Sequence, residues 1–200
     1  MMKADSVLTL ALKEWAIAVD ALGQGKTIVL LRKGGIREHR GKFEVQRDRV
    51  LLYPTYEHQK PDLLDPTFAR QVQPVPSGWH PEQVTLTVWA KITEIIEISN
   101  EEELAALLPF HIWTPQFARE RFRWKPRQPL CVLLLRAYRL PAPVTIPYCD
   151  AYGGCKSWID ITESVEIARS QPALTQDNYA QTVKRIRDAL TRSRATAELA

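Results

Sequence analysis

The chain has 200 residues, of which 45% are hydrophobic and 25% charged, and its 27 Lys and Arg against 23 Asp and Glu give a net charge of +4. This composition is typical of a globular protein, and a chain of this length buries enough surface to fold without disulfides or metals. The mildly basic charge is compatible with a nucleic-acid partner and also with charge that only serves solubility.

Cysteine number and apolar runs predict a cytoplasmic protein. The three cysteines are an odd and small number, which favours a reducing compartment. Asp5 and Lys13 interrupt the N-terminal apolar residues, so no secretory signal is expected. The longest apolar run, Leu130 to Leu135, is far shorter than the roughly 20 residues of a membrane helix. Histidines and cysteines lack the paired spacing of zinc sites, so we expect no metal and no cofactor.

The first third of the chain predicts a helix and then strands. Apolar residues recur at helical spacing over residues 6–22, although residues 15–21 also alternate like a strand. Residues 27–31 are typical of a buried strand. Residues 43–46 and 50–53 predict a hairpin, whose second strand Pro54 would end because proline cannot donate a backbone hydrogen bond.

The middle of the chain predicts a long loop and a long bent strand. Residues 60–81 contain five prolines and read as an irregular connection, either a functional loop or a packed surface loop anchored by Trp79. Residues 84–98 alternate like a strand with one slip, which a bulge near Glu94 would explain. A long bulged strand is typical of a small barrel or a strongly curled sheet.

The second half predicts two capped helices, two strands and a terminal helix. Asn100 and the three glutamates after it are typical of a helix start, as is Thr114 followed by Pro115. Residues 130–140 predict a buried strand, after which three prolines leave only short extended pieces. A glycine turn and a strand follow in residues 148–161, and residues from Gln176 onward form an amphipathic helix with a basic face.

These elements favour an α+β fold. Strands and helices do not alternate regularly, so we expect a curled mixed or antiparallel sheet with flanking helices rather than a doubly wound parallel sheet. The long bent strand, the helix pair and the glycine-rich return also suggest a PUA-like barrel by fold-level analogy. We expect residues 1–165 to form one domain and residues 166–200 to form a C-terminal basic amphipathic helix.

A basic glycine corner is the first candidate binding site. Consecutive glycines allow backbone N–H groups to face an anion, and neighbouring cations add charge. The alternative is a plain hairpin turn with solvated charges. The residues are Arg32, Lys33, Gly34, Gly35 and Arg37.

The second candidate site is the polar segment that follows residues 50–53. Glu57 and His58 have the side chains of an acid–base pair, and Tyr56 adds an aromatic ring. Adjacent residues of an extended chain point to opposite faces, so both groups would reach one substrate atom only in a turn. The alternative is a polar loop that hydrogen-bonds its own backbone.

The third candidate is the glycine-rich return of residues 152–158. Its glycines permit close backbone approach, Lys156 supplies charge, and Trp158 can stack on a base. Cys155 beside Lys156 is either a reactive thiol or a structural one. Basic and aromatic residues also interleave over residues 113–125, which adds Arg119 and Arg123. We expect the return to lie beside the first two candidate sites.

Five blocks of sequence carry a resemblance to a known family. The segments LKEWAIAVDAL, LLRKGGIRE, LYPTYEHQ, PLCVLLLRAY and YGGCKSW together resemble a bacterial, notably cyanobacterial, family called domain of unknown function 1802. The likeness covers roughly residues 8–162. The family defines no catalytic residues, so none carries over. Some members carry a fused restriction-endonuclease-like domain, which implies a recognition or accessory role linked to restriction–modification.

Three functional hypotheses follow from the sequence. The first is a non-catalytic module that binds DNA or RNA. The second is a small hydrolase or nuclease that uses Glu57 and His58. The third is a protein-interaction module that binds its partner through residues 176–194. No membrane partner is expected.

Overall fold

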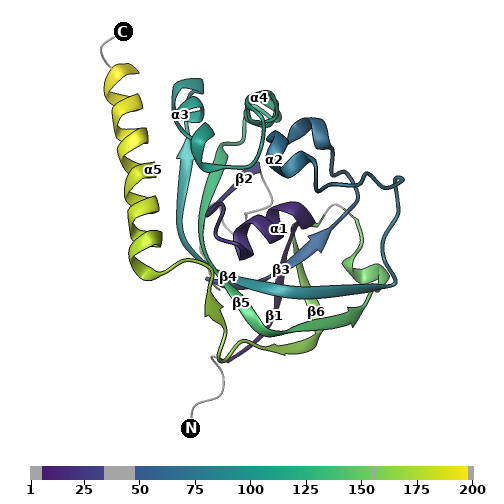
Figure 1. Cartoon of the computed structure of the whole chain (residues 1–200). Helices are drawn as coiled ribbons and strands as arrows, with labels where there is room; N and C mark the ends of the chain where they lie inside the picture. Colours follow the sequence, from purple (N-terminus) through teal and green to yellow (C-terminus); the bar gives the residue numbers. More distant parts are fainter. Residues whose placement is uncertain (1–5, 34–47, 155, 198–200) are drawn as a thin grey trace.

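A computed structural model describes residues 6–33, 48–154 and 156–197. One curled sheet organises these residues (Figure 1). β1 pairs in parallel with β3, and the other strand pairs are antiparallel, so the sheet is mixed. Along the sheet the strands are β2 (Val29–Lys33), β5 (Leu130–Pro147), β4 (Gln83–Ile98), β3 (Arg49–Thr55), β1 (Val7–Trp15) and β6 (Trp158–Glu166), with β7 (Gln171–Pro172) paired to β5.

The expected α+β class with a curled mixed sheet is confirmed. Within the described ranges, the outermost strands β2 and β6 do not pair with each other, so the curled sheet stays open and forms no closed barrel. The helices are α1 (Ala16–Gly23), α2 (Pro66–Ala69), α3 (Glu101–Ala106), α4 (Pro115–Arg123) and α5 (Gln176–Ala197), with short 3₁₀ turns at Pro61–Leu63, Leu108–Phe110 and Asp150–Tyr152. None of these helices has both the length and the apolar character of a membrane span.

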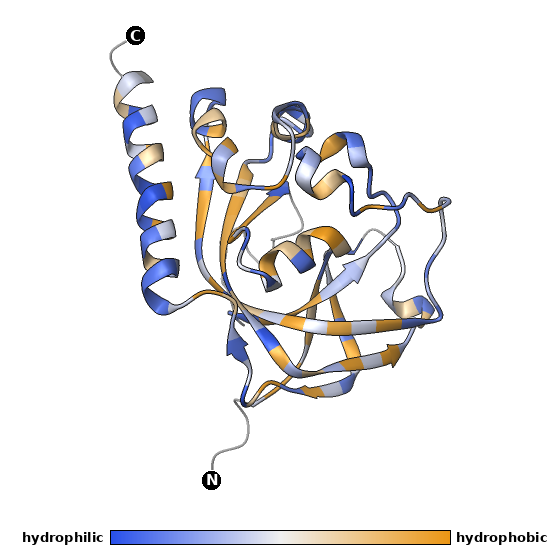
Figure 2. Cartoon of the chain, in the orientation of Figure 1, coloured by the Kyte–Doolittle hydropathy of each residue, from blue (hydrophilic) through white to orange (hydrophobic). Residues whose placement is uncertain are grey.

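Two hydrophobic cores lie on opposite faces of the sheet. Leu51 and Leu52 are neighbours on β3, yet they belong to different cores, because successive side chains of a strand point to opposite faces. The first core receives the mostly hydrophobic helix α1 and one face of the largely hydrophilic helix α5 (Figure 2). The second core consists almost entirely of side chains from β1, β3, β4, β5 and β6.

The helix expected over residues 6–22 is half wrong. Residues 7–15 form strand β1, and only α1 is helical. The strand carries apolar residues on both faces, with Ala11 in one core and Leu12 in the other. A strand that is buried on both faces loses its simple alternation and can show helical spacing by chance.

The prolines of β3 and β5 interrupt their strands less than expected. β3 continues through Pro54 to Thr55, with Pro54 in register with Glu14 of β1. β5 runs unbroken from Leu130 to Pro147, which corrects the expectation of short pieces. The register with β4 shifts between Leu86 and Val88, opposite the stretch with Pro141 and Pro143, so these prolines lie at a bulge, where no ladder donor is required.

Other local predictions are confirmed. The β4 register shifts between Ile92 and Glu94, where the bulge was expected. Asn100 Oδ1 accepts the backbone N–H of Glu103 at 2.8 Å and caps α3. Thr114 Oγ1 accepts the N–H of Phe117 at 3.2 Å and caps α4. The hairpin strand expected over residues 43–46 lies outside the described residues.

Candidate functional site

The described cations of the glycine corner lie in the interior. Arg32 is 8% exposed, and its Nη1 donates to Glu14 Oε2 at 3.0 Å. Lys33 is also buried, where its ammonium donates to the carbonyl of Phe122 and lies 5.3 Å from the centre of that ring. Arg32 therefore links β2 to β1, and Lys33 links β2 to α4. The other candidates of this corner, Gly34, Gly35 and Arg37, lie outside the described residues.

The remaining basic candidates lie on the surface, where Arg123 lines one hollow together with Lys33. Arg119 is exposed on α4, and Arg123 pairs with Glu101 of α3 at 2.6 Å. Lys156 is exposed and donates to the carbonyl of Ala151 at 3.3 Å, while Trp158 is half-buried beside the first core. Cys155 is outside the described residues. In the part of the chain that the structure describes, no group of three or more His, Cys, Asp or Glu is placed to hold a metal.

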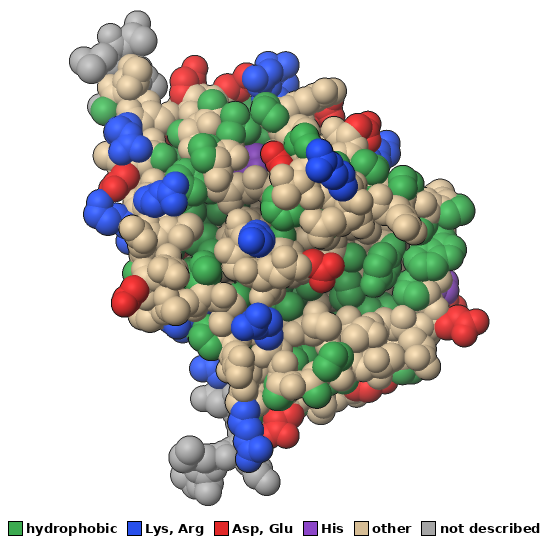
Figure 3. Space-filling model, in the orientation of Figure 1, with side chains coloured by type: hydrophobic (Ala, Val, Ile, Leu, Met, Phe, Trp, Pro, Cys, Tyr) green, Lys and Arg blue, Asp and Glu red, His purple; other side chains and the backbone are tan. Residues whose placement is uncertain are grey.

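The second candidate segment and the glycine-rich return meet in one hollow, which we call the tyrosine pocket. Its volume is about 200 Å³. Hydrophobic side chains gather on this side of the molecule, near the segment that leads from α2 to β4 (Figure 3). The lining residues are Lys13, Tyr53, Pro54, Thr55, Tyr56, Glu57, Gly78, Trp79, His80, Pro81, Val84, Tyr148, Tyr152, Gly153 and Gly154.

Glu57 serves as an anchor for the loop over the tyrosine pocket. Its Oε1 accepts the backbone N–H of Gly78 at 2.6 Å and the hydroxyl of Ser77 at 3.2 Å. The hydrogen bond from Gly78 lowers the pKa of this carboxyl. His58 Nε2 lies 3.6 Å from the same oxygen, and its positive φ of 69° provides the turn that brings the two adjacent side chains to one side. The pair is therefore in contact, with the carboxylate already engaged in holding the loop.

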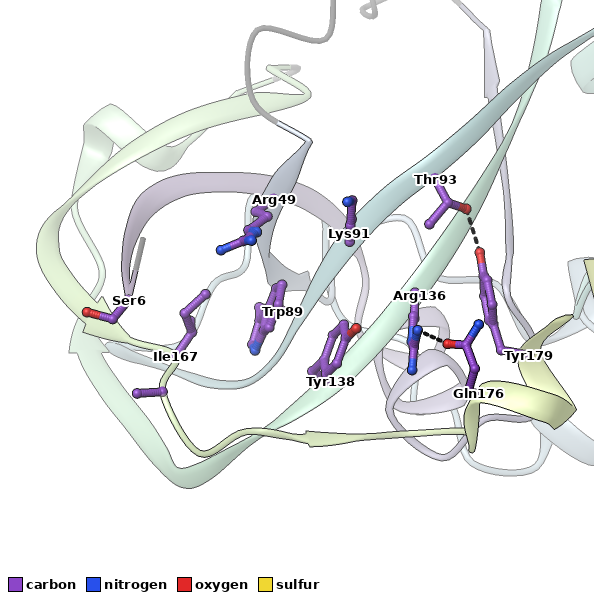
Figure 4. Close-up of a pocket in the computed structure, with 11 residues that line it drawn as sticks. Ser6, Arg49, Trp89, Lys91, Thr93, Arg136, Tyr138, Ile167, Gln176 and Tyr179 are labelled. Atoms are coloured by element: carbon purple, nitrogen blue, oxygen red, sulfur yellow. Dashed lines mark hydrogen bonds between the residues drawn. The ribbon is translucent and has the colours of Figure 1, made fainter. Parts of the chain in front are cut away.

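A second and larger hollow, which we call the cationic groove, opens over β3, β4, β5 and the start of α5. Its volume is about 560 Å³. Figure 4 shows the side chains that line it. Among the described lining residues, three are cations and none is an acid. The lining residues are Ser6, Arg49, Trp89, Lys91, Thr93, Arg136, Tyr138, Ile167, Ala168, Gln176 and Tyr179.

The three cations of the groove form a row across adjacent strands. Arg49 of β3 is directly opposite Lys91 of β4, and Lys91 is directly opposite Arg136 of β5. Like charges that face each other across a sheet destabilise it. Asp48 Oδ2, at 3.2 Å from Lys91 Nζ, offsets part of this repulsion. The row therefore places three positive charges side by side on one face of the sheet.

Aromatic rings extend from the cation row. Trp89 and Tyr138 stack face to face, with their ring centres 4.3 Å apart and their planes at 8°. The guanidinium of Arg136 lies between Tyr138 and Tyr179, at 5.6 Å and 5.8 Å from the two ring centres (Figure 4). Tyr179 is held by a 2.5 Å hydrogen bond between its hydroxyl and that of Thr93, and Arg136 is hydrogen-bonded to Gln176. These contacts fix the direction of the guanidinium.

The cationic groove was not predicted from the sequence. Its cations are Arg49, Lys91 and Arg136, which are far apart in the sequence and belong to no motif. The available signal was the exposed face of the strand over residues 84–98, on which Lys91 lies. Only the register between β3, β4 and β5 shows that the three charges form a row.

Comparison with known proteins gives one family and a partial structural likeness. No curated protein matches the sequence significantly. The crystal structure of the ASCH protein of Zymomonas mobilis aligns with 88% of this chain and 92% of its own, at 13% identity and a TM-score of 0.41. A tyrosine-to-phenylalanine variant of that protein aligns over 88% and 96%, at 12% identity and a TM-score of 0.42. Both scores are below 0.5, so the likeness is partial. The family model described as domain of unknown function (DUF1802) matches residues 11–185, and the chain belongs to that family.

Proposed function

We propose that this protein binds a single strand of nucleic acid, without catalysis, in the cationic groove. The observation that supports the proposal is the row of Arg49, Lys91 and Arg136 on three adjacent strands. Neighbouring strands are about 4.8 Å apart, so the row spans roughly 10 Å. Backbone phosphates along a strand would be attracted to this row of cations.

The aromatic part of the groove favours a nucleic acid over a simple anion. Proteins that bind single strands combine cations for the backbone with aromatic rings on which bases stack. Tyr138 is half-buried next to Arg136, so part of its surface remains accessible from the groove. The arrangement selects for a polyanion with planar groups and reads little base sequence.

Salt dependence of binding tests the proposal. Fluorescence anisotropy would follow the binding of labelled oligothymidylate and oligouridylate, with a DNA duplex for comparison. Neutralising three phosphates of a single strand predicts a log–log slope of affinity against salt of about −2. Absence of binding to either strand at low salt would contradict the proposal.

Two substitutions at one ion pair separate groove binding from unspecific attraction. Lys91→Ala removes the central charge of the row, and we expect weaker binding with a slope that is smaller by about 0.7. Asp48→Asn removes the partner of Lys91 and should strengthen binding. Arg70→Ala, at the exposed end of α2, is the charge-matched control and should leave affinity nearly unchanged. Equal effects of Lys91→Ala and Arg70→Ala would place binding elsewhere.

In the alternative of a small hydrolase, Glu57 and His58 act as an acid and a base. A carboxylate whose pKa is lowered by its hydrogen bond from Gly78 is a weak base, and moving it would release the loop over the pocket. This geometry supports binding over hydrolysis. Unchanged turnover of any hydrolysed substrate in His58→Ala would remove the alternative.

A further inference from the structure

We propose that the tyrosine pocket is a second binding site, which takes one uncharged planar ring of the size of a nucleobase. The pocket is separate from the cationic groove. Val84 of β4 lines the pocket and Trp89 of the same strand lines the groove, about 17 Å apart at the usual rise per residue. The inference therefore stands independently of the function proposed for the groove.

The volume of the pocket limits its ligand to one ring system. Sites for drug-sized ligands have volumes of about 300 Å³ or more, whereas benzene fits a cavity of about 150 Å³. The tyrosine pocket, with about 200 Å³, lies between these values. A purine or pyrimidine ring matches this space.

The walls of the pocket are aromatic faces and edges. His80 and Tyr148 stack with their ring centres 3.5 Å apart, and Tyr56 meets Trp79 edge to face at 5.9 Å. Trp79 is 43% exposed, which is a large apolar surface to leave in water. A planar ligand that covers Trp79 gains both burial and stacking energy.

The charged groups of the pocket are engaged by the protein itself. Lys13 Nζ donates to the carbonyls of Tyr152 and Gly154, at 2.6 Å and 2.9 Å. The carboxylate of Glu57 holds Gly78 and Ser77. Because both charges are satisfied internally, the pocket favours an uncharged ring over a phosphate or an amino acid.

One polar group of the pocket has no partner. Tyr53 is 3% exposed, and its hydroxyl makes no hydrogen bond with any described residue. Burial raises the pKa of this hydroxyl, so it stays protonated and can donate as well as accept. A buried hydroxyl without a partner is costly, and a ring nitrogen or carbonyl of a bound base would satisfy it. Tyr152 lies beside it but is already bonded, since its hydroxyl accepts the N–H of Thr162 at 2.9 Å.

Binding of free nucleosides tests this site. Adenosine, guanosine, cytidine and uridine carry no phosphate, so the groove contributes little to their binding. We expect at least one of them to bind at millimolar concentration or below and to shift the backbone amide resonances of Gly78, Gly153 and Gly154. Trp79→Ala should weaken this binding about tenfold. The matched control is Trp124→Ala, since Trp124 is the other strongly exposed tryptophan of the described chain, at 48%, and lies at the end of α4.

Tyr53→Phe gives a second test, because we expect it to change stability and nucleoside binding in opposite directions. Removing the unpaired hydroxyl should raise the melting temperature of the unliganded protein, by roughly 3 °C, and weaken nucleoside binding about tenfold. Failure of all four nucleosides to bind would overturn the proposal. Binding that is unchanged by both Trp79→Ala and Tyr53→Phe would overturn it as well. Lys91→Ala should not alter nucleoside binding, so failure here and failure of the groove remain distinguishable.

Discussion

Single residues in the interior set how stability responds to pH. His111 is buried, and its Nδ1 accepts the backbone N–H of Trp113 at 3.3 Å. Burial lowers the pKa of His111 to about 4. An unfolded chain has a histidine pKa of about 6.5 and takes up a proton below that pH, whereas the folded chain does not until about pH 4. The stability that depends on a neutral His111 is therefore fully present above about pH 6.5 and is lost as the pH falls towards 4.

This shift gives a pH prediction. Between pH 7.5 and pH 5, protonation of His111 in the unfolded chain should reduce the free energy of unfolding by about 2 kcal/mol. His111→Asn keeps an acceptor near the N–H of Trp113 and cannot gain the proton, so its stability should change less over this range. Urea unfolding at the two pH values measures the difference. A pH dependence that is the same in the variant and the wild type would contradict the assignment.

Between elements, the pair of Arg32 and Glu14 joins strands that are not neighbours in the sheet. Arg32 is on β2 at one edge, and Glu14 is on β1, with β5, β4 and β3 between them along the sheet. A distance of 3.0 Å between their side chains means that the curl brings these strands together across the open side. Arg32, a candidate binding residue of the glycine corner, is buried in this pair, which links β2 to β1 across the curled sheet.

Removing one partner of the pair between Arg32 and Glu14 should lower the free energy of unfolding. Arg32→Met leaves the carboxylate of Glu14 buried without its cation, and we expect a loss of about 3 kcal/mol in the free energy of unfolding. The double variant Glu14→Gln with Arg32→Met removes both charges and should recover part of that loss. Denaturant unfolding of both variants checks the prediction. Equal losses of unfolding free energy in the single and double variants would show that Arg32 stabilises the fold through packing and not through its charge.

At the scale of elements, the sequence predicted the features that depend on residues close together along the chain. The caps at Asn100 and Thr114 and the bulge before Glu94 follow from local hydrogen bonding and alternation, and the structure confirms them. Pairing between distant strands determined the rest. β1 is paired on both sides, by β3 and by β6, and this pairing decides between the strand and the helix that its residues are both compatible with.

The candidate sites show the same division. Tyr56, Glu57 and the return at Gly153 were singled out by composition, and the structure joins them in the tyrosine pocket. The cation row depends on the register of three strands, which residue types alone do not determine. Gly153 shows why residue types alone do not define a site. A Cβ at this position would approach the hydroxyl of Tyr148 to 2.8 Å, and only the folded structure reveals this contact.

For the whole molecule, α5 is an integral support of the domain. Its apolar face buries Tyr179, Ile186 and Leu190 against the first core. Arg187 pairs with Glu94 of β4 at 2.7 Å, and Arg194 Nε lies 2.9 Å from the buried carboxylate of Glu103 on α3. The helix also supplies Tyr179 to the cationic groove. A partner protein that binds residues 176–194 would therefore meet the outer, polar face of α5.

Loss of α5 should accordingly lower stability and nucleic-acid binding together. Ile186→Ala truncates one fully buried side chain, and we expect a loss of roughly 3 kcal/mol in the free energy of unfolding. Truncation after Thr175 should cost more and expose the amides of α3 and β4 to hydrogen exchange. Arg192→Ala on the exposed face is the control and should stay within about 0.5 kcal/mol of the wild type. A truncated chain as stable as the wild type would show that α5 is a separate unit.

The position of β1 has a consequence for synthesis. β1 is bordered by β3 on one side and by β6 on the other, and β6 is made about 150 residues later, with Val7 opposite Glu166. On the ribosome β1 emerges before β3 and β6 and completes its pairing only after β6 has been made. A nascent chain that stalls before Trp158 leaves one side of β1 unpaired, and such an edge is a template for association with other chains. The translation of residues 158–166 therefore decides whether this side of β1 is protected.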